Sequence, residues 1–371
     1  MTGHNCWGYS QKDGPSLWYK SYPIAQGSRQ SPIDIISMQA IYDPSLKPLN
    51  ISYESDSSLG ISNNGHSVMV DFKDVDDKTA ISGGPLENPY RLKQFHFHWG
   101  TSQKCGSEHT INGKSFPCEL HLVHWNAKKY TTFGEAVAAP DGLAVMGVFL
   151  EVGEEHATMN RLTDAFYMVK FKGTKAEFRS FNPSTLLPAG KKYWTYAGSL
   201  TTPPLHESVT WIVLKEAIQI SEKQMEKFRS LLFTTEEDEK IPMVNNFRPP
   251  QPLKGRVVRA SFRKAGGHHQ ALPFHPAFAE GNPAYDRRGG SPVRPSEDKR
   301  GRAEGGSYES KRGCSLPASP TPTKKKPAAR AKRVDTRLWR TWVLARTWSF
   351  PCLQALRSWG CWVFDFGKTG L

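Results

Sequence analysis

The stretch QFHFHWG, Gln94 to Gly100, decides the fold class of this chain, because its aromatic and polar side chains strictly alternate. An alternation with a period of two is typical of a β-strand, in which successive side chains point to opposite faces. Gln94, His96 and His98 therefore share one face of a predicted strand, and three aromatic rings share the other. Two imidazoles at positions i and i+2 of a rigid strand can converge on one metal ion.

A second stretch, ELHLVHW from Glu119 to Trp125, alternates in the same way. It places Glu119, His121 and Val123 on one face of a second predicted strand. If the two strands are neighbours, His121 supplies a third nitrogen to the pair above. His124 has the opposite parity, so we interpret it as a structural residue.

The three histidines His96, His98 and His121 predict a catalytic zinc site. A single histidine on a half-buried strand is usually a core or surface residue, and even the i, i+2 pair alone is a weak signal. Three neutral imidazoles with one open position are typical of catalytic zinc, whereas structural zinc usually has four ligands and often cysteine. Gln94 and Glu119 are candidates to hold the second nitrogen of two of these rings. Zn²⁺ is therefore the predicted cofactor.

Outward from these stretches, the first 262 residues read as a sheet-rich domain. Short apolar runs alternate with turn clusters such as SNNGHS (62–67) and TTPPL (201–205), a punctuation typical of many short strands. Helical signals are few. The clearest covers 221–233, where Ser221 can cap and apolar residues recur at helical spacing.

The composition changes near residue 262. Residues 263–371 carry a formal net charge of +13 out of +14 for the whole chain, so the first part is close to neutral. Residues 263–336 are rich in Gly, Pro, Ser and Arg, and 337–371 in Trp and Arg. Such a composition buries too little apolar surface to offset the entropy of ordering. We predict a folded domain over 1–262 and a disordered tail over 263–371, an extension rather than an evolved domain.

An alternative role for the tail is open at this stage. Its basic run PTKKKPAARAKR (322–333) is typical of segments that bind nucleic acid, anionic lipid or the nuclear import machinery. The N-terminus lacks the apolar core of a secretory signal, and arginines interrupt the most apolar stretch, 338–366. The cysteines form no C-x-x-C pair. A cytoplasmic location is therefore predicted.

Three long motifs resemble those of the α-class carbonic anhydrases of vertebrate cytosolic type. They are QFHFHWG, GSEHTINGKSFPCELHLVHWN and GSLTTPPLHESVTWIV, and the similarity runs over about residues 5–262. The resemblance implies one β-dominated domain around a twisted, mostly antiparallel ten-stranded sheet with a few peripheral helices. It also implies a monomer without an obligate protein partner. The implied reaction is the zinc-dependent, reversible hydration of carbon dioxide to bicarbonate and a proton.

The resemblance also assigns roles to residues. His96, His98 and His121 bind zinc, while Gln94, the backbone carbonyl of Asn246 and Glu119 hold them in that order. Zinc-bound hydroxide attacks CO₂; Thr201 accepts its hydrogen bond and donates to Glu108. Thr202 contacts bicarbonate. An apolar wall for CO₂ matches five residues: Val123, Val145, Leu200, Val209 and Trp211.

For the released proton, the resemblance implies a shuttle at His66, with Tyr9 and Asn64 ordering the water between it and the metal. An imidazole loads and unloads a proton near pH 7, since its ordinary pKa is about 6.5. Met69 departs from the polar amide usual in the family. Sulfonamide-type inhibitors are expected ligands. The competing hypothesis is a catalytically impaired binding domain, which usually lacks a zinc histidine; here all three are present.

Overall fold

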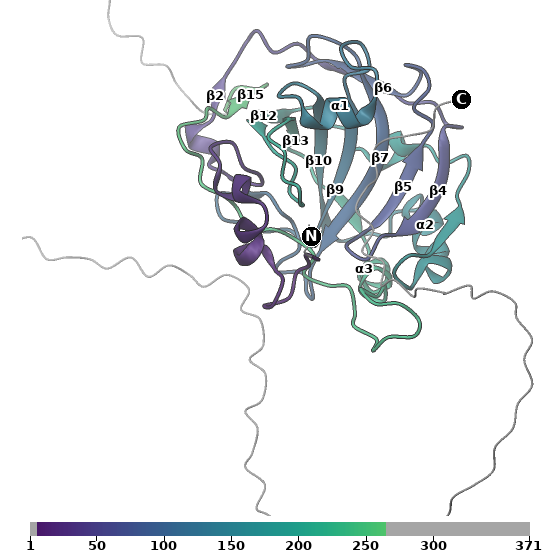
Figure 1. Cartoon of the computed structure of the whole chain (residues 1–371). Coiled ribbons are helices and arrows are strands. Elements are labelled where there is room, and N and C mark those ends of the chain that lie inside the picture. The colour runs from purple at the N-terminus through teal and green to yellow at the C-terminus, as the bar shows by residue number, and fades with distance from the viewer. Residues whose placement is uncertain (1–5, 265–371) are drawn as a thin grey trace, which may run out of the picture. The chain divides into compact units, whose positions relative to one another are not determined.

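Strands dominate residues 6–264, the part of the chain that the computed structural model describes (Figure 1). Ten strands form one continuous path in the order β11-β4-β5-β7-β9-β10-β13-β12-β15-β2, and β3, β6 and β14 join beside it. Most neighbouring strands are antiparallel, but β10 pairs in parallel with β13 and β14. The predicted β-dominated sheet is confirmed, with three strands beyond the expected ten.

The elements have the following bounds. The strands are β1 Asp34–Ile35, β2 Ile41–Tyr42, β3 Leu49–Ser52, β4 Ser58–Asn63, β5 Val68–Phe72, β6 Ala80–Gly83, β7 Tyr90–Trp99, β8 Thr110–Ile111, β9 Cys118–Trp125, β10 Leu143–Val152, β11 Lys175–Glu177, β12 Tyr193–Gly198, β13 Val209–Leu214, β14 Ile218–Ile220 and β15 Arg259–Ala260. The α-helices are α1 Phe133–Ala138, α2 Met159–Ala165 and α3 Glu222–Arg229. Five 3-10 helices cover Pro15–Lys20, Pro23–Gln26, Ser37–Gln39, Phe166–Val169 and Pro183–Leu186.

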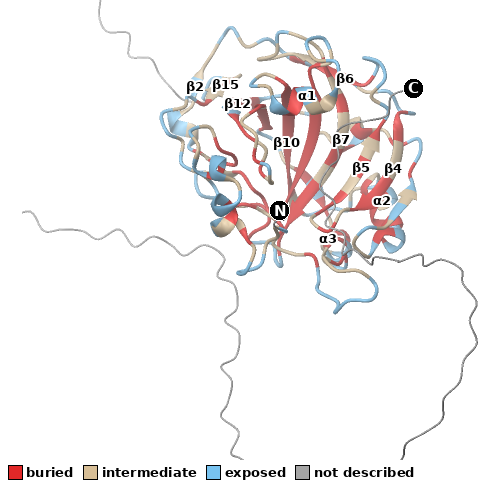
Figure 2. Cartoon of the chain, viewed as in Figure 1, coloured by how far each residue is buried: buried red, intermediate tan, exposed pale blue. Residues whose placement is uncertain are grey.

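Apolar clusters cover both faces of the central strands, which appear red in Figure 2. On β9, Leu120 and Leu122 join one cluster and Val123 joins the other. Every residue of β9 is buried, as expected where both faces of a strand are covered. Three aromatic side chains of β7, Phe95, Phe97 and Trp99, pack on the face of the sheet opposite the histidines. The ring of Phe97, for example, lies 4.9 Å from that of Phe228 in α3.

The predicted helix over 221–233 forms as α3, although it ends earlier, at Arg229. Ser221 and Gln224 form a complete capping box at its start. The apolar positions Met225 and Phe228 are fully buried. Within residues 6–264, no helix has the length and apolar character needed to cross a bilayer.

The predicted disordered tail over 263–371 lies outside the described residues, apart from Arg263 and Lys264. The last described strand, β15, pairs with β12 and β2, and Phe262 packs against the Trp194 ring. The boundary at residue 262 stays a prediction.

Candidate metal centre

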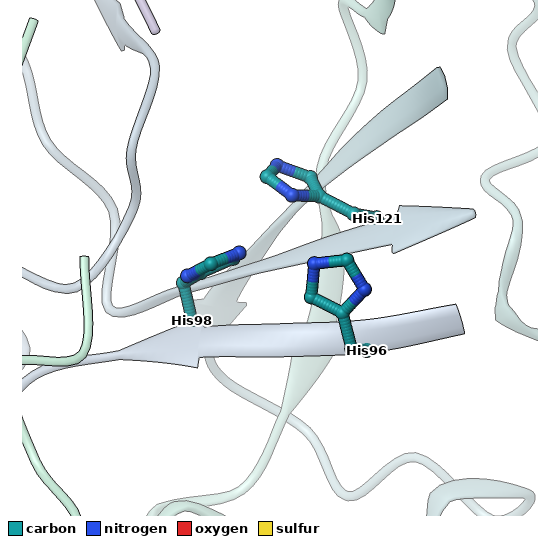
Figure 3. A group of neighbouring side chains, drawn as sticks. All are labelled: His96, His98 and His121. Atoms are coloured by element: carbon teal, nitrogen blue, oxygen red, sulfur yellow. The ribbon is translucent and has the colours of Figure 1, made fainter. Parts of the chain in front are cut away.

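Two neighbouring strands bring the three predicted histidine ligands together. β7 and β9 are antiparallel, with His96 directly opposite His121 and His98 opposite Glu119. Paired residues of antiparallel strands point to the same face. The alternation seen in the sequence therefore places all three imidazoles on one side of the sheet, as Figure 3 shows.

The three rings face a common point. Their centroids are 5.1 Å apart for His96 and His98, 5.3 Å for His96 and His121, and 4.7 Å for His98 and His121. One nitrogen from each ring lies within 4.8 Å of the others. His98 and His121 are each 1% exposed. This spacing suits three nitrogen ligands around one small cation.

The second nitrogen of each ring is held by an oxygen. Nδ1 of His96 lies 2.9 Å from Oε1 of Gln94, and Nδ1 of His98 lies 2.7 Å from the backbone oxygen of Asn246. Nε2 of His121 lies 2.7 Å from Oε1 of Glu119. Because carbonyl and carboxylate oxygens only accept hydrogen bonds, each outer nitrogen donates. In the neutral imidazole that binds a metal, this leaves the lone pair on the inner nitrogen, which faces the common point.

Two buried polar atoms near this common point have no hydrogen-bond partner within residues 6–264. A metal ion bound there would give them one, so they test whether the site fits a metal. Nε2 of His98 and Oε2 of Glu108 are buried without a hydrogen-bond partner among residues 6–264, and they lie 3.4 Å apart. Buried polar atoms are otherwise nearly always paired. Burial lowers the pKa of His98, and together with the neighbouring rings it holds the pKa of His96 well below its ordinary value. The convergence of these three imidazoles, together with the unpartnered polar atoms between them, fits a zinc ion with three nitrogen ligands and an open position.

Glu119 is the centre of a buried hydrogen-bond cluster behind His121. Besides His121, its carboxylate accepts from the backbone N–H groups of Glu108 and His109. Nδ1 of His109 lies 2.7 Å from Oε1 of Glu119, and Nε2 lies 2.6 Å from the Tyr196 hydroxyl. Burial alone would raise the pKa of Glu119, but His109 and His121 hold it below its usual value. The carboxylate is therefore charged and orients His121.

Glu108 lies beside two of the histidines, but no hydrogen bond joins it to Thr201 within residues 6–264. Oε1 of Glu108 accepts from the backbone N–H of Arg248 at 2.8 Å. Oε2 of Glu108 lies 3.4 Å from His98 Nε2 and 3.9 Å from His121 Nδ1. Thr201 is 5% exposed and lies two residues after Ser199, whose backbone N–H donates to Ser31 Oγ. The Thr201–Glu108 bond implied by the resemblance stays a prediction.

The predicted apolar wall is one cluster of side chains. Val145 on β10 lies opposite Val123 on β9 and beside Trp211 on β13. The Trp211 ring is 4.8 Å from the His121 ring. The remaining members, Val209 and Leu200, join the same cluster. The five side chains thus form an apolar surface next to the histidines. Thr202, two residues after Leu200, is half-buried, and its backbone oxygen accepts a hydrogen bond from the Leu205 N–H.

The predicted proton-transfer residues lie together near the N-terminal segment. Oδ1 of Asn64 accepts from the backbone N–H groups of His66 and Ser67, and so builds the turn that carries His66. The His66 ring stacks on Trp7, with centroids 3.7 Å apart. The Tyr9 hydroxyl is buried without a hydrogen-bond partner among the described residues. Met69, the residue that departs from the family pattern, lies on β5, directly opposite His96 on β7.

Three contributors escaped the reasoning from the residues themselves. His109 stands beside Glu108 in the motif GSEHT, but nothing in that spacing indicates a bond to Glu119. Arg248 and Ser31 are distant in sequence from the three candidate ligands His96, His98 and His121. By contrast, His124, which the parity left outside the ligand set, is buried, with its ring nitrogens 2.7 Å from the Tyr53 hydroxyl and 3.2 Å from the Ala144 oxygen.

Comparison with known proteins agrees with the geometry. A family model described as eukaryotic-type carbonic anhydrase matches residues 13–262. Carbonic anhydrase 7 of Homo sapiens is 75% identical over 263 residues, which cover 71% of this chain and 100% of the relative. Carbonic anhydrase 7 of Mus musculus is 74% identical over the same extent. The motifs quoted above resemble this isozyme in particular.

Proposed function

This chain belongs to the eukaryotic-type carbonic anhydrase family, and on that premise we propose that it catalyses the reversible hydration of carbon dioxide to bicarbonate and a proton. The observation that carries the proposal is the convergence of three imidazole nitrogens, from His96, His98 and His121, beside an apolar wall. Such a site offers a metal an open position where an uncharged substrate can approach.

The proposed cofactor is Zn²⁺, held by the inner nitrogens of the three histidines. When bound, zinc acts as a Lewis acid that lowers the pKa of a coordinated water and so makes hydroxide available near neutral pH. The chain's own contribution is to fix the ligands. Gln94, Asn246 and Glu119 hold the outer nitrogens, a support that typically matters for both metal affinity and activity.

Two kinds of residue would act on the substrate. Carbon dioxide has no net charge or dipole, so the apolar surface of Val123, Val145 and Trp211 suits it better than a polar clamp would. The Thr201 hydroxyl, donating to Glu108, would orient the attacking oxygen without reorganisation at the moment of reaction. Thr202 would contact the bicarbonate product. A sulfonamide anion would compete for the same open position.

The released proton would leave through Tyr9, Asn64 and His66. These residues lie on the N-terminal side of the site, and Nδ1 of His66 has no partner within residues 6–264. Asn246 donates from Nδ2 to the His66 backbone oxygen at 2.9 Å, so the turn that carries His66 is tied to the same residue that holds His98. We propose His66 as the group that passes the proton to solvent.

Stopped-flow CO₂ hydration tests the proposal, with and without removal of zinc by a chelator. Removing zinc from the native chain is expected to abolish activity, and adding it back to restore it. His96→Ala is expected to lose more activity than the roughly 10- to 100-fold typical of an outer hydrogen-bond partner, whereas Gln94→Ala should fall within that range. His156→Ala, a histidine at the start of α2, is the matched control and should keep native activity.

A folded, zinc-loaded chain without hydration activity would overturn the proposal in favour of a catalytically impaired binding domain. No structural feature of residues 6–264 favours that second function, since all three predicted ligands converge. The cytoplasmic location, the monomeric state and any binding of nucleic acid or membrane by the tail stay predictions.

A further inference from the structure

One short segment, Asn246 to Arg248, touches the metal centre twice. The backbone oxygen of Asn246 accepts from His98 at 2.7 Å, and the backbone N–H of Arg248 donates to Glu108 at 2.8 Å. The segment lies outside the named strands and helices. A ladder of backbone hydrogen bonds therefore does not fix its position, and another contact must do so.

Side chains at both ends of the segment supply such contacts: the Asn246 amide accepts from the Trp99 N–H at 2.8 Å and donates to the His66 oxygen at 2.9 Å, and the Arg248 side chain anchors the other end. It is 2% exposed, and it donates from Nη1 to Oε1 of Gln30 at 2.8 Å and to the backbone oxygen of Ser31 at 2.9 Å. Nη2 donates to the backbone oxygen of Ala25 at 3.2 Å. Burial lowers the pKa of Arg248 to about 10, so the group remains charged at neutral pH. Three acceptors on one planar donor fix both its place and its rotation.

Ser31 is also connected, through a chain of hydrogen bonds, to the second candidate ligand, His121. Oγ of Ser31 lies 2.9 Å from the Tyr196 hydroxyl, which lies 2.6 Å from His109. His109 in turn contacts Glu119, the partner of His121. The contacts that support His98 on β7 and those that support His121 on β9 therefore both lead to the segment 30–31.

We infer that Arg248 is a positioning residue for the metal centre: its buried guanidinium ties the segment 246–248 to the segment 25–31 and thereby sets the places of His98 and Glu108. The inference rests on the proposed function and deepens it. It predicts that the charge of Arg248 alone is insufficient. A lysine offers no planar fork, so it cannot reproduce all three contacts at once.

The test compares Arg248→Met and Arg248→Lys with the native full-length chain. The matched control is Arg161→Met, because Arg161 also donates to two backbone oxygens, those of Ser180 and Arg179, but contacts no residue of the metal centre or of the segments 25–31 and 246–248. Four properties are measured: the rate of zinc release to a chelator, the visible spectrum of the Co²⁺-substituted protein, kcat and KM for CO₂ hydration, and Tm. The first two report on the ligands without reference to turnover.

Arg248→Met is expected to release zinc about tenfold faster, to alter the cobalt spectrum and to lower kcat/KM by about tenfold, the low end of the range for outer partners of metal ligands. Arg248→Lys should fall between Arg248→Met and the native chain. Arg161→Met should change Tm alone. An Arg248→Met protein with lower Tm but native zinc release, spectrum and kcat/KM would overturn the inference.

Two further outcomes are distinguishable. If Arg248→Met does not fold, Gln30→Met is the fallback variant, because it removes only one acceptor of the Arg248 guanidinium. Native zinc release and kcat/KM in Gln30→Met would overturn the inference. A change in the same direction as in Arg248→Lys would support it. If the native chain itself neither retains zinc nor hydrates CO₂, the proposed function fails instead, and the inference fails with it.

Discussion

The His66 ring has surroundings that differ from those its proposed role requires. It stacks on Trp7 with an angle of 8° between the ring planes. Burial first, and the nearby positive charge of Lys172 second, lower the pKa of His66 to about 4, against an opposing effect of Asp13. The ring is therefore neutral throughout the range from pH 5 to 8. A proton shuttle with a pKa near 6.5 needs the ring to be more solvated than it is here.

Removing the Trp7 indole is expected to raise the pKa of His66 toward 6.5, because the ring regains water. The Trp7→Ala variant is compared with the native chain by NMR titration of the histidine ring protons. His156, whose pKa is lowered by its own burial, is the internal control and should not move. A His66 pKa that stays near 4 in Trp7→Ala would show that the indole does not cause the shift.

The same shift has a consequence for stability. The unfolded chain binds a proton at His66 near pH 6.5, whereas the folded chain does so only near pH 4. Between these values the unfolded state binds more protons, so the contribution of His66 to stability falls as the pH falls through this window. In Trp7→Ala the pKa of His66 in the folded chain moves closer to that in the unfolded chain. The loss of stability that His66 causes on acidification should therefore be smaller in this variant.

Among the elements, β7 and β9 show why the ligand set could be predicted. Side-chain direction along a strand is a local property with a period of two, so Gln94, His96 and His98 share a face wherever the strand is placed. His124 breaks this parity, and its ring accordingly lies behind the sheet, stacked against Tyr53. The pairing of His96 with His121 required the two strands to be neighbours, which alternation alone does not establish.

Helix α3 depends on its first turn. Oγ of Ser221 accepts from the Gln224 N–H at 3.2 Å, and Oε1 of Gln224 accepts from the Ser221 N–H at 3.0 Å. Ser221→Ala removes one of these bonds and is expected to lower the free energy of unfolding by about 1 kcal/mol. Urea denaturation measures this. Ser230→Ala, at the other end of the helix, is the control and should stay within about 0.5 kcal/mol of the native chain.

A loss at Ser221→Ala no greater than at Ser230→Ala would mean that tertiary packing, not the cap, determines where α3 begins. That packing is considerable, since Met225 and Phe228 are fully buried. Gln224 also joins α3 to α2 through Asn160 and the backbone oxygen of His156. The Ser221 hydroxyl, in contrast, contributes to the helix start alone.

At the scale of the whole molecule, the charge divides the chain more sharply than any other property. Residues 263–371 carry nearly all of the net charge of +14, and the family model ends at residue 262. The relatives quoted above are each covered completely by a 263-residue match. The described residues already hold the complete candidate site.

Ending the chain at residue 264 is therefore expected to leave zinc-dependent CO₂ hydration unchanged within about twofold, because residues 6–264 contain every residue of the candidate site and the whole span that the family model matches. Stopped-flow assays of residues 1–264 and of the full chain measure this. A truncated protein that loses activity would show that the tail supports the domain. Salt-dependent binding to RNA or to anionic vesicles by the full chain alone would instead reveal a separate role for the basic run at 322–333.

The sequence alone determined the strand character around the site, the face shared by His96 and His98, the parity of His121, Glu119 and Val123, and the cap of α3. All of these follow from local periodicity or from contacts within one turn. Asn246, Arg248, His109 and Ser31 were decided only by the tertiary structure, or in the case of Asn246 by resemblance. Their partners lie up to 223 positions away along the chain. Contacts of that kind depend on how loops pack across the finished sheet, and no local pattern encodes them.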